Sequence, residues 1–320
     1  MKIKERPEDF LVTEIPNRTW NTSGEYFVYE VTKRNLTTAE MRKRLAQQNG
    51  LRVQDIGYAG SKDRQAITKQ YITTPKEIRV SDPLIALVLV GRSDDHLRLG
   101  DLLGNEFVIR VHEVVASQEV TIPNYFGDQR FSKNNVEVGL CFLRADYKQL
   151  IALLKDQYPQ IQEHLERTPT DYIGALRRVP LHTLLMYVHS VQSYLFNQAV
   201  CTYVQEVSAN PLRASYRHGE LLFCTEELTN QEVPIPGAVQ ELGEWERYYA
   251  PTLRELRISP SQFYIKSFPQ LTQEGTSRQL LADITDLSIK QLSTTSYEVR
   301  MRLGVGSYAT VALLGLFKDC

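Results

Sequence analysis

Apolar and polar residues follow two clear periods along the chain. Over residues 297–303 (YEVRMRL) they alternate strictly, and this period of two predicts a strand with one face on a core. Over residues 181–207 apolar residues recur at steps of three and four, which predicts a helix that buries one side. The chain is therefore expected to combine strands and helices.

The amino-terminal part is expected to be rich in strands. Residues 25–33 (EYFVYEVTK) have the aromatic and β-branched composition of a strand. Thr37 stands three residues before Glu40, the spacing of a capping box, and Gly50 follows, so a helix is expected over 39–48. Shorter patterns predict strands at 55–59, 70–73, 84–90 and 106–115, and helices at 146–157 and, behind an N-cap at Ser307, at 308–317.

This order of elements predicts an α+β fold with a mainly antiparallel sheet. A strand-rich beginning, a helical middle and a strand-helix ending indicate one α+β domain that is interrupted by a largely helical insertion. The boundaries are expected near Tyr147 and Asp283. They divide the chain into a first part at 1–147, an insertion at 148–282 and a C-terminal part of the first domain at 283–320.

Composition narrows the class of protein. The chain has 320 residues, of which 42% are hydrophobic, enough for a sizeable core. The longest apolar stretches, 84–90 and 309–317, are far shorter than the roughly 20 residues of a membrane-spanning helix. The charged N-terminus lacks the apolar segment of a secretory signal. A cytoplasmic protein that is not inserted in a membrane is expected.

No local pattern calls for a metal or a cofactor. The cysteines and the histidines are scattered, without the close spacing of a zinc site, so the thiols are expected to be buried or idle. The chain also lacks a glycine-rich dinucleotide fingerprint and a P-loop. We therefore expect neither a metal nor a cofactor.

Charge is distributed unevenly. The net charge is −1, which does not favour a protein that is basic all over. Residues 40–70, however, hold seven Lys or Arg against three acids. A solvated helix face would explain the run at 42–44, and the uneven charge becomes informative only beside the motif that it flanks.

The most distinctive stretch is 57–70 (GYAGSKDRQAITKQ). Its glycines allow a tight turn after a strand, and the turn presents Lys62, Asp63 and Arg64. A carboxylate between two cations is favoured in its ionised form, which suits a nucleophile, so an ion pair of Asp63 with Lys62 or Arg64 is expected. Taken alone, the same three residues are also typical of an ordinary polar turn.

A second stretch, 123–134 (PNYFGDQRFSKN), combines aromatics, an amide and cations around a glycine. It is typical of a pocket for a flipped base, with Phe126 stacking on the base and Asn124 donating or accepting hydrogen bonds nearby. A loop whose aromatic side chains fill the core would look the same.

These stretches resemble the motifs of the TruD family of pseudouridine synthases. The family pattern is matched by GxKDxxAxT around Asp63, by NYFGxQRF at 124–131, and by KxxPEDFxVxE at 4–14. Fainter matches follow in the expected order at 190–198, 233–237, 275–280 and 306–310. The resemblance implies a pseudouridine-synthase-like catalytic domain with an inserted TruD-specific domain.

The resemblance also implies roles for individual residues. Asp63 corresponds to the nucleophile, and Lys62 is its neighbour in the active site. Asn124 and Phe126 line the site, Phe126 as the residue that stacks on the target base. Lys4 and Phe10 approach the same site. The chain is shorter than is common in the family.

The activity implied is isomerisation of uridine to pseudouridine in RNA, most often in tRNA at uridine 13. The enzyme is expected to need no cofactor and to be monomeric. The basic stretch at 40–70 is then expected to contact RNA phosphates. Two alternatives stay open at this point. One is a noncatalytic RNA-binding or chaperone protein of the same fold. The other is a glycoside hydrolase, which normally uses two acids flanking the bond, whereas Asp63 has no obvious acidic partner.

Overall fold

The computed structural model describes residues 1–116, 120–132 and 134–319. The chain forms two compact units. Unit 1 comprises residues 1–117, 283–309 and 317–320, and unit 2 comprises residues 118–282 and 310–316. The fold is mixed α+β with a mainly antiparallel sheet, as the sequence predicts.

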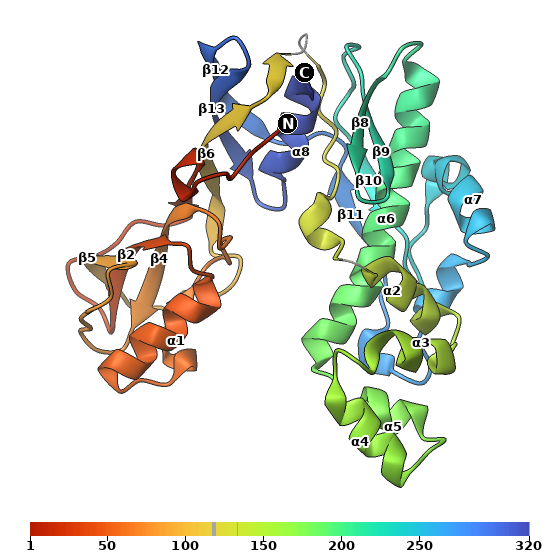
Figure 1. Cartoon of the computed structure of the whole chain (residues 1–320), viewed down its shortest axis with the longest axis horizontal. Coiled ribbons are helices and arrows are strands. Elements are labelled where there is room, and N and C mark those ends of the chain that lie inside the picture. Colours follow the sequence, from red (N-terminus) through yellow and green to blue (C-terminus); the bar gives the residue numbers. More distant parts are fainter. Residues whose placement is uncertain (117–119, 133, 320) are drawn as a thin grey trace. The chain divides into compact units, whose positions relative to one another are not determined.

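Unit 1 is built on an eight-stranded sheet (Figure 1). Its strands, in spatial order, are β12 (Ile284–Ser293), β13 (Ser296–Gly304), β6 (Leu102–His112), β1 (Phe10–Pro16), β4 (Ile67–Thr74), β2 (Tyr26–Arg34) and β5 (Ile85–Ser93), with β3 (Gly57–Tyr58) paired to β4. The pair β1 and β4 is parallel, and the other pairs are antiparallel. A two-stranded ladder joins β7 (Val114–Ala116) and β14 (Phe317–Asp319).

The strand pattern at 297–303 is confirmed, because every apolar residue of that stretch is buried in β13. Its neighbour β12 was not predicted from the sequence. The reason is that β12 is exposed along nearly its whole length, and its apolar residues Leu287, Ile289 and Leu292 do not follow the regular alternation of a half-buried strand. It is a strand because it pairs with β13.

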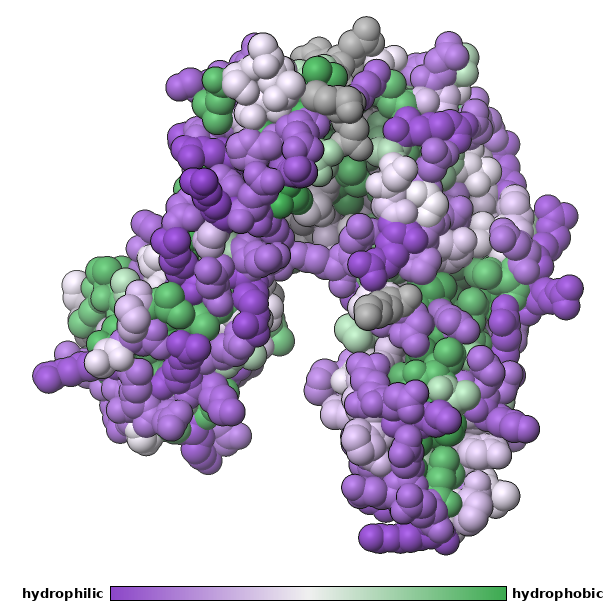
Figure 2. All heavy atoms as spheres, in the orientation of Figure 1, coloured by the Kyte–Doolittle hydropathy of each residue, from purple (hydrophilic) through white to green (hydrophobic). Residues whose placement is uncertain are grey.

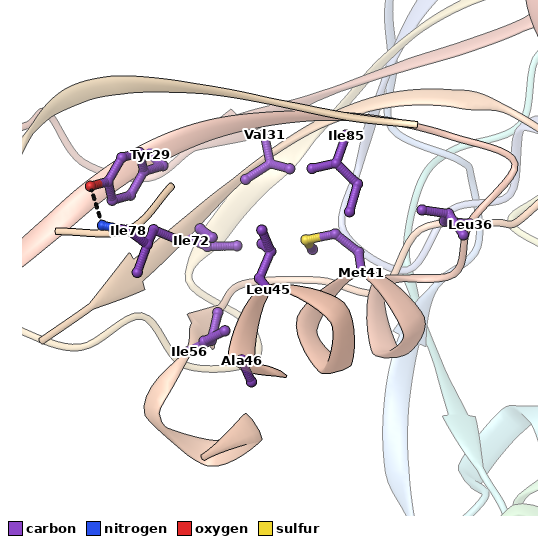
Figure 3. Close-up of a cluster of buried hydrophobic side chains, with 10 residues drawn as sticks. All are labelled: Tyr29, Val31, Leu36, Met41, Leu45, Ala46, Ile56, Ile72, Ile78 and Ile85. Atoms are coloured by element: carbon purple, nitrogen blue, oxygen red, sulfur yellow. Dashed lines mark hydrogen bonds between the residues drawn. The ribbon is translucent and has the colours of Figure 1, made fainter. Parts of the chain in front are cut away.

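Helix α1 (Thr38–Asn49) covers one face of this sheet. The capping box is confirmed: Glu40 N donates to Thr37 Oγ1 at 3.2 Å, and Thr37 N donates to the Glu40 carboxylate at 2.9 Å. Gly50 ends the helix with φ of +58°, a left-handed conformation that favours glycine. Beneath the helix lies a core of buried residues from β2, β4, β5 and α1 (Figure 3).

Unit 2 is organised around the long helix α6 (Leu181–Val207), which has the bounds that the sequence predicts. Helix α6 packs against α2 (Asn135–Leu143) and α7 (Glu246–Glu255) (Figure 1). The predicted helix at 146–157 is shorter, α3 (Tyr147–Leu154), because Tyr158 precedes Pro159, which disfavours helical backbone. Two further helices follow, α4 (Pro159–Arg167) and α5 (Tyr172–Leu176).

Unit 2 also contains strands that the sequence pattern did not reveal. They form two ladders, β8 (Leu212–Tyr216) with β9 (Gly219–Phe223), and β10 (Glu232–Ile235) with β11 (Thr276–Gln279). Helix α6 contacts both β9 and β10. The last helix of the chain is α8 (Ala309–Leu316).

The visible surface is mostly hydrophilic, with scattered hydrophobic residues, as on ordinary protein surfaces (Figure 2). Within the described part of the chain, no helix has the length and apolar content needed to cross a bilayer. Cys141, Cys201 and Cys224 are buried free thiols, and burial raises the pKa of each. Cys320 lies outside the described residues.

Candidate active site

Asp63 lies in unit 1, in the loop between β3 and β4. Its Oδ2 is 2.6 Å from the Nζ of Lys4, and about a third of the Asp63 side chain (32%) is exposed. The Lys4 ammonium also lies 4.1 Å from the centre of the Phe10 ring. The structure therefore brings together three of the residues that the resemblance selected, an ionised pair resting on an aromatic face.

Lys4 reaches this position with an unusual backbone. Its φ is +60°, a region that residues with a side chain rarely occupy. Phe10 begins β1, which is paired on both sides, with β4 and β6, so the ring below Lys4 is held by the centre of the sheet. Strain of this kind persists only where the surrounding contacts enforce it.

The expectation that Asp63 is paired with its sequence neighbours is wrong. Lys62 Nζ lies 2.5 Å from Glu14 Oε2, and both side chains are buried, at 5% and 1% exposure. Arg64 pairs with Glu40. The Lys62 side chain is therefore buried beside Glu14, while the Asp63 side chain stays about one-third exposed (32%).

The backbone of the Asp63 loop is fixed by buried polar groups. Lys62 N donates to Thr38 Oγ1 at 2.9 Å, and Thr38 Oγ1 donates to Gln70 Oε1 at 2.9 Å. The Gln70 amide in turn donates to the carbonyl oxygen of Gly60 at 3.3 Å. The loop is thus tied to α1 and β4, which is the preorganisation that a nucleophile requires.

Gly57 has a steric role at the start of this loop. A Cβ at this position would lie 2.4 Å from Thr73 Oγ1 and 2.6 Å from the carbonyl oxygen of Leu97. Both distances are far inside van der Waals contact. The glycine therefore allows the chain to pass close to β4 before it turns toward Asp63.

The basic stretch at 40–70 is mostly engaged within the protein. Six of its seven cations make an ion pair or bond to backbone carbonyl oxygens: Arg42, Arg44, Arg52, Lys62, Arg64 and Lys69. Arg42 in addition covers the ring of Tyr58 at 4.3 Å. A phosphate that binds to this stretch must therefore compete with existing contacts, so the expected phosphate surface is weaker than the charge count suggested.

Asn124 and Phe126 lie in unit 2 and are linked by Arg278. Arg278 donates from Nε to the carbonyl oxygen of Asn124 and from a terminal nitrogen to its side-chain oxygen, both at 2.7 Å. Its guanidinium lies 4.2 Å from the centre of the Phe126 ring. Asn124 and Phe126 are each 7% exposed. The sequence suggested Phe126 alone as the stacking residue, whereas in the structure a guanidinium also lies against its ring.

Phe126 is also held through its backbone. Its N–H donates to Asn197 Oδ1, and its carbonyl oxygen accepts from Asn197 Nδ2, both at 2.9 Å. The Phe126 ring meets Phe196 edge to face at 5.5 Å. Asn197 and Phe196 belong to α6, so the rigid helix sets the position of this ring.

The Phe126 ring lines a cavity of about 250 Å³ within unit 2. The other lining groups are mainly polar and include Arg130, His189, Gln192 and Thr276. His189 shares a hydrogen bond of 2.9 Å with Gln273, and burial lowers its pKa, so the neutral ring is favoured. Aromatic and hydrogen-bonding walls together suit a planar polar ligand.

Sequence analysis did not select Arg278, Asn197 or Glu14 as site residues. Each lies in a stretch that matches the family pattern, at 275–280, 190–198 and 4–14. The signal was present in those matches, but only the structure shows which side chain makes which contact. Among the described residues, no three His, Cys, Asp or Glu side chains are grouped as ligands for a metal ion.

Comparisons with known proteins give one family. The family model described as tRNA pseudouridine synthase D (TruD) matches residues 1–162, 159–232 and 222–314. "Probable tRNA pseudouridine synthase D" of Nanoarchaeum equitans is 28% identical over 383 residues, covering 100% of this chain and 99% of that protein. The protein of that name from Methanosarcina acetivorans is 27% identical over 409 residues, covering 98% and 91%.

The fold agrees with this match. The TruD crystal structure from Methanosarcina mazei superposes with a TM-score of 0.71 at 24% identity, covering 98% of this chain and 92% of that one. The family model and this fold together span nearly the whole sequence. The chain therefore belongs to the tRNA pseudouridine synthase D (TruD) family, whose members are isomerases.

Proposed function

We propose that this protein converts uridine to pseudouridine at position 13 of tRNA, with Asp63 as the nucleophile. The observation that carries the assignment is the Asp63 carboxylate, which is bound to the Lys4 ammonium at 2.6 Å and is still one-third exposed (32%). An ionised, fixed and accessible carboxylate within a matching family motif is what this chemistry needs. RNA is the substrate class that the family implies.

The reaction breaks the bond between N1 of uracil and C1′ of ribose, rotates the uracil, and joins C5 to C1′. The proton on C5 is then lost and N1 regains one, so substrate and product contain the same atoms. Asp63 either attacks C1′ directly or removes the C2′ proton to give a glycal. Both routes require a carboxylate held in place, and the ion pair with Lys4 holds it.

The target base must leave the RNA stack before it can react, which costs a few kcal/mol. We propose that Phe126 recovers part of this cost by stacking on the flipped uracil, with Asn124 beside it. The ring borders a cavity with polar walls, and Asn197 and Arg278 hold it in place. A pocket of this kind would keep the free uracil from diffusing away while it turns.

Replacing Phe126 with Ala is expected to lower kcat/KM for tRNA by about 10- to 100-fold, because stacking on an aromatic ring is worth roughly 1–3 kcal/mol per base. Binding of a tRNA with cytidine at position 13 should change little. The measurement is the rate of pseudouridine formation beside a binding titration with that unmodifiable tRNA. Equal losses in both would show that Phe126 serves the core of unit 2 and not the base.

The assay that tests the proposed function uses tRNA labelled with tritium at C5 of uridine. Pseudouridine formation releases this tritium to water, whereas a glycoside hydrolase would release free uracil and a noncatalytic RNA-binding protein would release neither. A matched tRNA with cytidine at position 13 identifies the site. Tritium release that persists with this control would place the target at another uridine.

A further inference from the structure

Lys33 is a lysine inside the protein core. It lies on β2 with an exposure of 0% and is among the largest fully buried side chains. Buried residues alternate along this strand, so Lys33 shares the face of Tyr29 and Val31, both of which belong to the core beneath α1 (Figure 3). A charged residue thus occupies a position where the strand pattern calls for an apolar one.

The Lys33 ammonium makes two hydrogen bonds to backbone. It donates to the carbonyl oxygen of Leu36 at 2.5 Å and to the carbonyl oxygen of Asp63 at 2.9 Å. Leu36 leads into α1, whereas Asp63 is 30 residues away along the chain. The side chain therefore connects β2 and the start of α1 to the main chain of the proposed nucleophile.

This contact is maintained at an energetic cost. Removing an ammonium from water is unfavourable, and burial lowers the pKa of Lys33 to about 8. The charged groups around it are Asp63 and Lys62 of the loop and Glu40 of α1. Asp63 and Glu40 favour the ammonium and Lys62 opposes it. An apolar residue would fill this core position without the penalty, so the packing of the sheet does not account for a lysine.

We propose that Lys33 is a positioning residue for the isomerisation, fixing the main chain of Asp63 so that its carboxylate stays aligned with the sugar. This inference rests on the proposed role of Asp63. Lys4 holds the carboxylate and Lys33 holds the peptide unit behind it, so the two lysines restrain the nucleophile at both ends. Lys33 itself is buried and does not touch the substrate.

The first test is Lys33→Met, which keeps the length of the side chain and removes the ammonium. We expect the single-turnover rate of pseudouridine formation to fall by about 100-fold, the effect of misplacing a reacting group by about 1 Å. The Kd for tRNA should stay within about twofold. Lys290→Met, a matched change at an exposed lysine on β12, should leave both quantities unchanged. A folded Lys33→Met protein with a wild-type rate overturns the proposal.

The pH profile is a second test that does not depend on the folding of Lys33→Met. Charge-assisted hydrogen bonds are about twice as strong as neutral ones, so the wild-type rate should fall as pH rises past about 8. Lys33→Arg keeps its charge and should not show this fall. A wild-type rate that stays flat from about pH 7 to about 9.5, or a parallel fall in both proteins, overturns the proposal.

The free energy of unfolding should rise over the same pH range in which the rate of pseudouridine formation falls. Above the lowered pKa of Lys33, the folded state binds fewer protons at this residue than the unfolded chain does. The contribution of Lys33 to the free energy of unfolding therefore rises with pH above about 8, while activity falls. If Lys33 served only the stability of the fold, its loss of a proton would stabilise the protein and would leave the reaction rate unchanged.

The outcomes separate this inference from the proposed function. If Asp63→Asn is inactive and Lys33→Met is fully active, only the positioning role fails. If Asp63→Asn is active, the nucleophile has been misassigned and the role of Lys33 fails with it.

Discussion

Asp63→Asn is expected to abolish pseudouridine formation while the protein still folds and binds tRNA. The amide has the size of the carboxylate, so the packing of the loop between β3 and β4 is kept. It carries no charge, however, and can neither attack C1′ nor remove the C2′ proton. Loss of a residue that makes or breaks the covalent bond typically lowers kcat by about 10⁴-fold or more.

The measurement is tritium release from tRNA at saturating enzyme, beside a binding titration with the same tRNA. Asp286→Asn provides a matched control in unit 1, because Asp286 is exposed and its partner is Arg302, on the neighbouring strand. This control should react at the wild-type rate. Conversion by Asp63→Asn at that rate would show that Asp63 is not the nucleophile.

The elements that the sequence predicted best are those whose pattern depends on local interactions. The period of α6, the capping box before α1 and the alternation in β13 are set within short segments, and all three are found in the structure. The strands that the sequence did not predict form because they pair with other strands. The apolar residues of strand β12 are exposed and irregularly spaced, and the strands β8, β9, β10 and β11 have only four or five residues each, too few to show a clear period.

The family motifs selected three residues that lie together in unit 1, but they did not predict the contacts of those residues. Family motifs selected Lys4, Phe10 and Asp63, which the structure brings together across 59 residues of sequence. Adjacency in sequence suggested that Lys62 pairs with Asp63, and this was wrong because a loop residue's partner is decided by which strand lies beneath it. For Lys62 that strand is β1, which presents Glu14.

One sequence signal would have found more of the site. Charged residues stand at positions where the alternation of a strand requires burial: Glu14 follows Phe10 and Val12 on the buried face of β1, and Lys33 follows Tyr29 and Val31 on β2. A buried charge is costly unless it is paired or hydrogen-bonded, so such exceptions mark polar sites inside a core. Both residues serve the Asp63 loop.

Breaking the pair formed by Glu14 and Lys62 is expected to destabilise unit 1 more than breaking an exposed ion pair, because one buried charge would be left without its partner. The nitrogen and oxygen of the pair are 2.5 Å apart, and the side chains are 1% and 5% exposed. Glu14 also accepts a hydrogen bond from Tyr71 N through Oε1 at 3.1 Å, so its two oxygens are satisfied by different partners. Removing the lysine would leave a buried carboxylate with one neutral donor.

Lys62→Met should therefore lower the free energy of unfolding by about 3–5 kcal/mol, the usual cost of leaving a buried charge unpaired. Glu14→Gln combined with Lys62→Met should restore most of this loss, because the amide is neutral and can still accept from Tyr71. Lys69→Met removes a half-exposed ion pair on β4 and should cost less than about 1 kcal/mol.

Urea unfolding followed by tryptophan fluorescence measures these differences. Trp20 lies in unit 1 and packs 5.3 Å from Tyr71, so in a Trp245→Phe background the signal reports on the sheet that holds the pair. If Lys62→Met is no less stable than Lys69→Met, the buried pair does not stabilise the sheet. If the double variant is as unstable as Lys62→Met alone, the loss comes from the packing of the lysine stem and not from the uncompensated charge of Glu14.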